Sequence, residues 1–278
     1  MKFGVHAGLW QVKWTDEMTP AFKAAADLGY DGIEVSLLGM TDEKAASLKA
    51  LGRDHGLEIT CSDGLAPDKD ITSSDPAIRA AGVEYLKWAI EATAKIGSRG
   101  LAGVVFGAWG QFDPLNKPQR AANSAQSLAQ LHDTLVAFDV NLGIEMLNRF
   151  ETDLVNTAQE AVSLAEAAQS DRIGVLLDTF HLNIEEKDIH AAIAHAKDKL
   201  VHFHVSDNDR GVPGSGHVPW DQVKTALDDI GYDGWIVAEM FVIAGNPTSA
   251  DLNIWRNIEP EAGDAAARAL TFMKSTFG

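Results

Sequence analysis

Short apolar runs alternate along the whole chain with longer segments in which apolar residues recur at helical spacing. Apolar runs bounded by turn residues predict buried strands, and the longer periodic segments predict helices. The predicted strands cover residues 2–9, 33–36, 57–62, 100–106, 141–146, 173–178, 200–205 and 235–239. The predicted helices cover residues 19–28, 42–55, 75–96, 120–138, 157–169, 188–197, 220–230 and 260–277.

This alternation predicts an α/β fold, a single (β/α)8 TIM barrel formed by one domain over residues 1–278. An internal echo supports it, because residues 27–32 (DLGYDG) resemble residues 229–234 (DIGYDG) before the second and the eighth strand. No linker or change of composition divides the chain. The rival fold is an open doubly wound sheet, which would normally carry a glycine-rich phosphate loop after its first strand. Residues 4–10 do not supply one.

Four predicted strands in the second half of the chain end in a hard metal ligand: Glu145, Asp178, His204 and Glu239. The carboxyl ends of the strands of such a barrel open on one face, so these side chains are expected to meet there. Three carboxylates and one imidazole suit a divalent ion of the Mg, Mn or Co type better than a structural zinc ion. Any one of them alone could instead be a hydrogen-bonded polar group at a strand end.

Loops after these strands carry hydrogen-bonding groups suited to a polyhydroxylated ligand, namely Glu151, His181 and Arg210. The glycine-rich segment 211–216 is expected to fold over the site. Aromatic residues on or beside strand ends commonly form the walls of sugar pockets. Those found here are Trp10, Trp14, Trp109 and Phe241.

Composition limits the partners and the compartment. The net charge of -17 and the pI near 4.8 argue against nucleic acid, whose phosphates require clustered Lys and Arg. Cys61 is the one cysteine, which excludes an internal disulfide and suits a reducing compartment. No apolar run approaches the roughly 20 residues that span a bilayer, and the N-terminus does not resemble a secretory signal. We therefore expect a cytoplasmic protein without a membrane partner.

Several motifs resemble the ketose 3-epimerases, the D-tagatose and D-allulose (psicose) 3-epimerases among the xylose-isomerase-like barrels. They are residues 145–151 (EMLNRFE), 177–186 (LDTFHLNIEE), 202–204 (HFH) with Arg210, 219–220 (PW) and 254–256 (IWR). The segment DTFHLNIEE is highly specific and the others are weaker. The resemblance spans the chain.

The resemblance implies that Glu145, Asp178, His204 and Glu239 bind a divalent metal, usually Mn²⁺, with Mg²⁺ or Co²⁺ possible. It implies that Glu145 and Glu239 are the acid/base pair. It further implies that Glu151, His181 and Arg210 hold the sugar's oxygens near carbons one to three, and that the chain forms a homodimer or tetramer. Departures from the family pattern at residues 206–210 (SDNDR), at Met240 and at His6 leave the identity of the sugar open.

The function predicted is metal-dependent epimerisation of a free ketose at C3 through a cis-enediolate. The alternative within this fold is a related isomerase, dehydratase or lyase acting on a keto-sugar or keto-glycoside. Barrels of this superfamily that cleave DNA at abasic sites use a zinc cluster with many more His ligands, and only 9 His occur here. A non-catalytic sugar-binding module would have no use for two carboxylates that flank a ligand.

Overall fold

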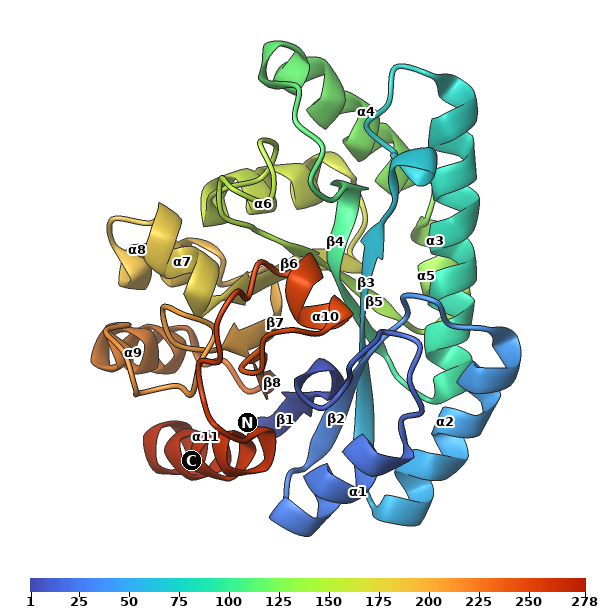
Figure 1. The fold of residues 1–278 in the computed structure, drawn as a ribbon. Coiled ribbons are helices and arrows are strands. Elements are labelled where there is room, and N and C mark those ends of the chain that lie inside the picture. Colours follow the sequence, from blue (N-terminus) through green and yellow to red (C-terminus); the bar gives the residue numbers. More distant parts are fainter.

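The computed structural model describes residues 1–278, and its eight parallel strands close into a barrel in sequence order (Figure 1). The last strand pairs with the first, so the sheet has no free edge. The strands are β1 (Lys2–His6), β2 (Gly32–Ser36), β3 (Glu58–Leu65), β4 (Gly100–Ala108), β5 (Asn141–Glu145), β6 (Ile173–Asp178), β7 (Leu200–Val205) and β8 (Trp235–Ala238).

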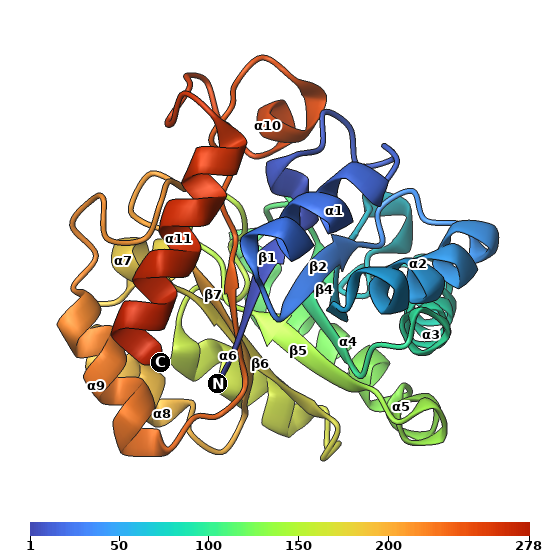
Figure 2. The same ribbon diagram turned by 90° about the horizontal axis from the view of Figure 1, so that it is seen from below.

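Helices form the outer layer around this barrel, and β1 and the C-terminal helix lie side by side (Figure 2). The α-helices are α1 (Thr19–Leu28), α2 (Asp42–His55), α3 (Pro76–Ile96), α4 (Lys117–Ala129), α5 (His132–Phe138), α6 (Ala158–Ala167), α7 (Thr179–Glu185), α8 (Ile189–His195), α9 (Trp220–Ile230), α10 (Pro247–Asp251) and α11 (Ala262–Phe277). Short 3-10 helices are η1 (Ala7–Leu9), η2 (Pro67–Lys69) and η3 (Pro114–Asn116). None of the helices is both long and apolar enough to cross a membrane.

Local signals in the sequence account for where helices begin and end. Thr41 caps α2 by accepting a hydrogen bond from the backbone N–H of Lys44, and Asp75 caps α3 through the N–H of Ala77. In the repeated turn, Gly29 and Gly231 follow α1 and α9 with φ of 85° and 67°. Only glycine adopts this left-handed conformation at little cost, so the two turns feed β2 and β8 in the same way.

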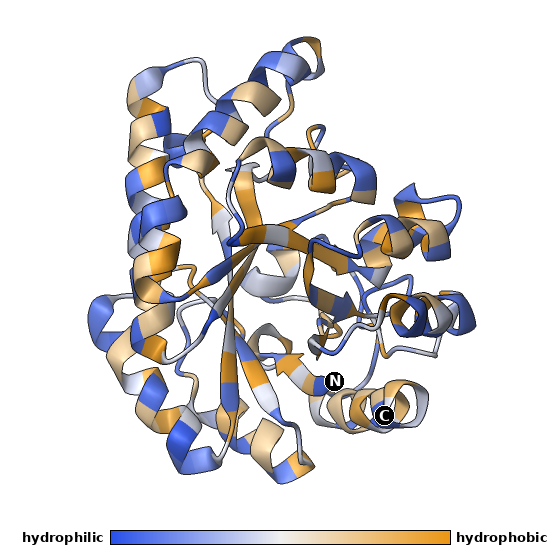
Figure 3. Cartoon of the chain, turned by 180° about the vertical axis from the view of Figure 1, so that it is seen from behind, coloured by the Kyte–Doolittle hydropathy of each residue, from blue (hydrophilic) through white to orange (hydrophobic).

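Apolar side chains on both faces of the strands form one continuous core of 69 buried residues. Strands of a parallel sheet are covered on both sides, which explains why their sequences are apolar runs without alternation. Figure 3 shows hydrophobic residues on the strands and on one side of the surrounding helices, whereas the outer helix faces are hydrophilic. Cys61 is buried on β3, as a small core side chain.

The strand boundaries differ from the prediction where side chains capture backbone groups. The first strand ends at His6 instead of residue 9, because the His6 ring accepts a hydrogen bond from Gly8 N–H and caps η1. The third strand continues to Leu65, beyond the predicted residue 62, because it pairs with β4 across a bulge at Gly64 and Leu65.

The helix boundaries show three further differences. The helix predicted over 120–138 is two helices, because backbone hydrogen bonds shift to three-residue spacing at Gln130 and Leu131. The segment after β6 is a helix that the prediction omitted, and Asp178 caps it through the N–H of Phe180. The short α10 was also missed; Asn246 caps it by accepting from Ser249 N–H.

Candidate active site

The four predicted ligands meet at the carboxyl ends of four consecutive strands. One donor atom each of Glu145, Asp178, His204 and Glu239 lies within 4.8 Å of every other. Glu145 and Asp178 are the last residues of β5 and β6, His204 lies near the end of β7, and Glu239 follows β8. The barrel register aligns these ends, since Glu145 is level with Leu176 and Asp178 is level with His204.

A buried carboxylate fixes the orientation of the His204 ring. Glu34 of β2 accepts from His204 Nε2 over 2.8 Å, which leaves Nδ1 directed at the cluster. Nδ1 lies 3.5 Å from Glu239 Oε2 and 3.9 Å from Glu145 Oε1, and it has no hydrogen-bond partner. An imidazole held through one nitrogen by a carboxylate is the usual arrangement of a histidine that binds a metal through the other.

Glu34 is held in turn by two further side chains. Its second oxygen accepts a hydrogen bond from Thr60 Oγ1 at 2.9 Å and lies 2.7 Å from His202 Nε2. Burial alone would raise the pKa of Glu34, but His204 and His202 hold that pKa well below its usual value. An ionised carboxylate therefore sits beneath the cluster and supports His204.

Arg210 supplies the positive charge of the site. Its Nη1 donates to Asp178 Oδ2 and to Glu239 Oε2, both over 2.7 Å. The guanidinium is buried and lies over the Phe180 ring, 4.2 Å from the ring centre. Arg210 has a φ of 66°, a strained conformation for a residue with a side chain. Strain of this kind collects at functional sites, where the surrounding contacts maintain it.

The predicted substrate-binding group Glu151 belongs to a hydrogen-bonded set with His181. Asn148 donates its backbone N–H to His181 Nδ1 over 3.1 Å and its side-chain amide to Glu151 Oε1 over 2.8 Å. The other ring nitrogen of His181, Nε2, lies 3.1 Å from Arg210 Nη2 and 3.7 Å from Glu145 Oε1. Burial, with Arg210 beside it, holds the pKa of His181 well below its usual value. Trp109 Nε1 donates to Glu151 Oε2 over 3.1 Å.

The metal-ligand cluster, formed by Glu145, Asp178, His204 and Glu239, carries excess negative charge. The pKa values of its members are shifted in different directions. Burial and the charge of Glu239 raise the pKa of Glu145 well above its usual value, and burial raises the pKa of Asp178 to about 6. Glu239 behaves in the opposite way, because His204 and Arg210 outweigh burial and lower its pKa. Burial lowers the pKa of His204, but Glu34 and Glu239 more than offset this and raise it well above its usual value. Such a site favours a bound cation, whether a proton or a metal ion.

The donor set fits a divalent metal ion. Carboxylate oxygens and one imidazole are ligands that Mn²⁺ and Mg²⁺ accept, and the unpaired His204 Nδ1 is the atom that a metal ion would satisfy. Glu34 holds the opposite nitrogen of the same ring. The chemistry of these side chains therefore supports a metal site without further rearrangement of the histidine.

A cavity of about 550 Å³ opens above the cluster, large enough for a monosaccharide. All five predicted substrate-binding residues line it together with both glutamates: Trp109, Glu151, His181, Arg210, Phe241, Glu145 and Glu239. Trp14 also lines the cavity, whereas Trp10 does not, because it follows η1 and packs against the core.

The glycine-rich segment 211–216 does not form a wall of this cavity, contrary to the prediction. Asp207 holds this segment away from the cavity, since its carboxylate accepts hydrogen bonds from the N–H groups of Gly214 and Val218 and from Trp220 Nε1. A side chain at Gly216 would clash with Asp207, 2.2 Å from its Oδ1. The departure from the family pattern at Asp207 thus anchors a loop.

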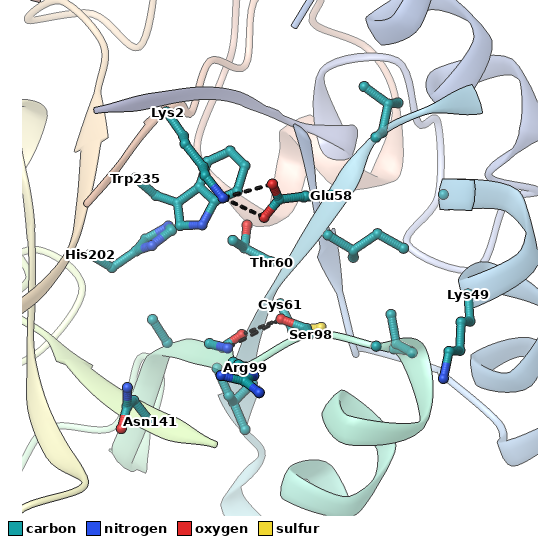
Figure 4. A pocket seen from close by; sticks show the side chains of 18 of the residues that line it. Lys2, Lys49, Glu58, Thr60, Cys61, Ser98, Arg99, Asn141, His202 and Trp235 are labelled. Atoms are coloured by element: carbon teal, nitrogen blue, oxygen red, sulfur yellow. Dashed lines mark hydrogen bonds and ion pairs between the residues drawn. The ribbon is translucent and has the colours of Figure 1, made fainter. Parts of the chain in front are cut away.

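A second cavity of about 580 Å³ lies at the opposite end of the barrel, around the first residues of the strands (Figure 4). Lys2 and Glu58 pair above it, and the exposed side chains of Lys49 and Arg99 lie at its edge. His202 and Trp235 form another part of its wall. No group of carboxylates converges there.

Among the polar residues of the site that sequence reasoning missed are Glu34, His6 and Ser62. Glu34 carried a readable signal, because a carboxylate inside the apolar run of residues 33–36 is costly unless a partner compensates its charge. His6 and Ser62 line the cavity on the side of β1 and β3, and His6 Nε2 lies 3.0 Å from Ser62 Oγ. A single histidine and a single serine at strand ends carry no comparable signal.

Comparison with known proteins agrees with this geometry. Residues 22–275 match the family model described as a xylose isomerase-like TIM barrel. A D-psicose 3-epimerase of Agrobacterium fabrum is 32% identical over 288 residues, covering 100% of both chains. An L-ribulose 3-epimerase of a Methylomonas species is 32% identical and covers 100% of this chain and 98% of its own.

Solved structures show the same relationship. A crystal structure of a D-psicose 3-epimerase in the presence of D-fructose superimposes with a TM-score of 0.95 at 32% identity, with complete coverage of both chains. The structure of an L-ribulose 3-epimerase gives a TM-score of 0.93 at 33% identity and covers 99% of this chain and 94% of its own. The chain therefore belongs to the xylose isomerase-like TIM barrel family and, within it, to the ketose 3-epimerases.

Proposed function

We propose that this protein epimerises a free ketose at C3 through a cis-enediolate, with sugars such as D-psicose and L-ribulose, named for its relatives, as the first candidates. The observation that carries the proposal is the pair Glu145 and Glu239. Their carboxylates come from strands five and eight, lie within 4.8 Å of each other and line one cavity. Epimerisation needs one group that removes a proton and another that returns it to the opposite face.

The different charge states of the two glutamates suit these roles. In the direction written here, Glu239 starts as the ionised base, a form that His204 and Arg210 favour, and Glu145 is the carboxyl that starts with a proton. Glu239 takes the proton from C3, and the electrons of the broken C–H bond enter the enediolate. Glu145 then gives a proton to C3 from the other face, which inverts that carbon. In the reverse direction the two glutamates exchange roles.

Other side chains orient the sugar around this pair. His181 lies beside Glu145, with Nε2 at 3.7 Å from Glu145 Oε1, and Glu151 offers carboxylate oxygens fixed by Asn148 and Trp109. Arg210, bonded to Glu239 and Asp178, adds positive charge where the enediolate forms. Trp109 and Phe241 form aromatic walls of the cavity.

Glu145, Asp178, His204 and Glu239 are the residues that would hold a divalent ion, with Mn²⁺ as the first candidate and Mg²⁺ or Co²⁺ as substitutes. When bound, such an ion stabilises negative charge on the substrate oxygens beside the carbon that loses its proton. The support for this site is the oxygen-rich donor set and the unpaired His204 Nδ1.

The proposal is tested by isotope exchange. The protein is incubated with Mn²⁺ and a panel of ketohexoses and ketopentoses in D₂O, and the products are analysed by NMR. We expect deuterium at C3 and formation of the C3 epimer. Glu145→Gln serves as the matched control, because it keeps the side-chain volume and removes the proton donor. Absence of exchange across the panel would contradict the proposal, and release of water or a leaving group would indicate an elimination instead.

We further propose that the chain forms a homodimer or tetramer. The support is a set of exposed apolar side chains on loops that follow β4, β5 and β8. They are Phe112, Leu115, Phe150 and Trp255, which are 52%, 92%, 72% and 74% exposed. Light scattering after size exclusion tests the assembly, and Phe150→Ser with Trp255→Ser should shift it toward the monomer. A monomeric wild-type protein at micromolar concentration would contradict the proposal.

A further inference from the structure

The cavity at the amino ends of the strands, the lower cavity, has a charge opposite to that of the chain as a whole. The chain has 40 acidic and 23 basic residues. The lower cavity is lined by one acidic residue, Glu58, and by four basic ones: Lys2, Lys49, Arg53 and Arg99. The active-site cavity is lined by one basic residue, Arg210, and by five acidic ones: Asp63, Glu145, Glu151, Glu239 and Asp251. A small anion is therefore attracted to the lower cavity and disfavoured in the active-site cavity.

Much of this positive charge is not neutralised within the protein. Lys49 of α2 forms no ion pair, and its methylene groups lie against Gly97, where a Cβ would be 3.5 Å from Lys49 Cγ. Arg99 Nη2 lies 3.1 Å from Asp139 Oδ2, but Arg172 donates to the other oxygen of that carboxylate over 2.9 Å. Two guanidinium groups thus share one negative charge. The edge of the lower cavity keeps positive charge that is left for a ligand.

The inner wall of the lower cavity offers polar atoms without partners beside an aromatic ring (Figure 4). His202 is only 5% exposed; its Nε2 lies 2.7 Å from Glu34 Oε2, and its Nδ1, which faces the cavity, has no protein partner. Trp235 lies across Gly32, where a Cβ would be 2.5 Å from its ring, and its Nε1–H has no acceptor in the protein. Buried polar groups are normally hydrogen-bonded, so these free atoms are available to a polar ligand.

These features together define the class of ligand. Guanidinium and ammonium groups bind phosphate oxygens, an aromatic ring packs on the face of a sugar, and a cavity of about 580 Å³ has the size for a monosaccharide. We propose that the lower cavity binds a phosphorylated monosaccharide, with its phosphate at the edge that carries Lys49 and Arg99 and its sugar against Trp235 and His202. No pair of carboxylates converges there, so the ligand is bound and not transformed. The inference does not depend on the proposed epimerase reaction.

Each cavity has a tryptophan that reports on it. Trp235 lines the lower cavity, whereas Trp109 lines the active-site cavity. The full chain is labelled with ¹⁵N-tryptophan, Trp235→Phe and Trp109→Phe assign the two indole N–H signals, and D-fructose 6-phosphate is added in the presence of Mg²⁺. We expect a saturable shift of the Trp235 signal. No shift of that signal at up to about 10 mM sugar phosphate, ten times the Kd of a millimolar site, would overturn the inference.

Two further compounds separate the parts of the recognised molecule. Inorganic phosphate should reverse the shift caused by the sugar phosphate, but only at a higher concentration, because it lacks the contacts of the sugar ring. D-Fructose should leave the Trp235 signal in place over the same range, because it lacks the charge. A response of Trp235 to D-fructose equal to its response to the phosphate ester would contradict the inference.

Charge substitutions test where the ligand lies. Lys49→Gln and Arg99→Gln should each weaken binding of D-fructose 6-phosphate about two- to fivefold, the range for one exposed ion pair. Glu58→Gln removes the one acidic residue of the lining and should strengthen binding at least about twofold. Lys95→Gln is the matched control, because Lys95 of α3 is an exposed side chain that does not line the cavity, and it should leave binding unchanged. An equal loss in Lys95→Gln would show that only the net charge of the protein is sensed and would overturn the inference.

The same variants test a purely structural role for the basic residues. Arg99 follows the carboxyl end of α3, and Lys49 lies against that end at Gly97. The carbonyl groups of a helix end also favour positive charge. Urea unfolding of Lys49→Gln and Arg99→Gln measures this contribution. Weaker binding of the sugar phosphate with unchanged stability is the result expected, whereas a loss of stability with unchanged binding would overturn the inference.

Discussion

The two ends of the barrel have cavities of nearly equal size and very different chemistry. The one at the carboxyl ends of the strands measures about 550 Å³ and the one at the amino ends about 580 Å³. The first has buried carboxylates, two imidazoles and a buried guanidinium converging on one point. The second has exposed ions at its edge, such as Lys2, which pairs with Glu58 in solvent (Figure 4).

Volume therefore does not distinguish the functional end, whereas buried charge does. Burying Asp178, Glu145 and Arg210 costs desolvation free energy, and their mutual contacts offset that cost only in part. A fold retains such an arrangement where chemistry requires it. The exposed pair of Lys2 and Glu58 has no comparable cost, and exposed ion pairs contribute little to stability.

The comparison between the two ends of the barrel is tested most strongly by removing a proton-transfer group from the cavity at the carboxyl ends of the strands. Glu145→Gln and Glu239→Gln should each lower kcat for ketose epimerisation by about 10²- to 10⁴-fold, the typical contribution of a positioned acid or base. Circular dichroism checks that the variants remain folded. A loss below about tenfold in both would mean that the glutamates are not the acid and base.

The next largest contrast between the two ends of the barrel is between the two carboxylates of β3, Asp63 and Glu58. Asp63 is a buried residue of the cavity wall, where its Oδ1 accepts from Tyr85 and Gly64 while its Oδ2 has no partner. Burial raises its pKa to about 7. The folded protein thus holds this proton more tightly than the unfolded chain does. The resulting stability is complete below about pH 4 and is lost as the pH rises through about 7.

Between pH 5 and pH 8 this carboxyl should cost the wild-type protein about 2.5 kcal/mol of unfolding free energy. Asp63→Asn keeps the Oδ1 acceptor and should remove this part of the pH dependence. Urea unfolding at the two pH values measures it. Identical pH dependence in the two proteins would show that Asp63 ionises normally.

The repeating pattern of the sequence was sufficient to predict the barrel and the convergence of four ligands. Strand order in a (β/α)8 barrel brings strand ends together whatever the loops do, so Glu145 and Glu239 could be paired from their positions alone. The break at Gln130 and the helix α7 escaped prediction because each depends on local hydrogen bonds. Glu34, His6 and Ser62 depend on partners far away in the sequence, which periodicity does not reveal.

Glu34 links the two ends, because His202 and Thr60 line the lower cavity and also contact this carboxylate. Glu34→Gln removes the charge that holds His204 Nε2, and we expect Mn²⁺ affinity to fall about 10- to 100-fold. Calorimetric titration with Mn²⁺ measures the change. Thr60→Val is the control, since it removes one hydrogen bond to Glu34 but leaves the carboxylate, and it should have a smaller effect. Unchanged affinity in Glu34→Gln would show that His204 is held by other contacts.

The smallest effect is expected at the amino end of β3. Glu58 and Lys2 are 60% and 51% exposed, and solvent screens their attraction. Glu58→Gln should therefore change the unfolding free energy by less than about 1 kcal/mol, and less at high salt. Its epimerase activity should match the wild-type protein, because no buried group depends on this carboxylate. A loss of activity above about threefold would mean that charge at the lower cavity is felt through His202 and Glu34 at the metal-ligand cluster. The two ends would then have to be treated as one coupled site.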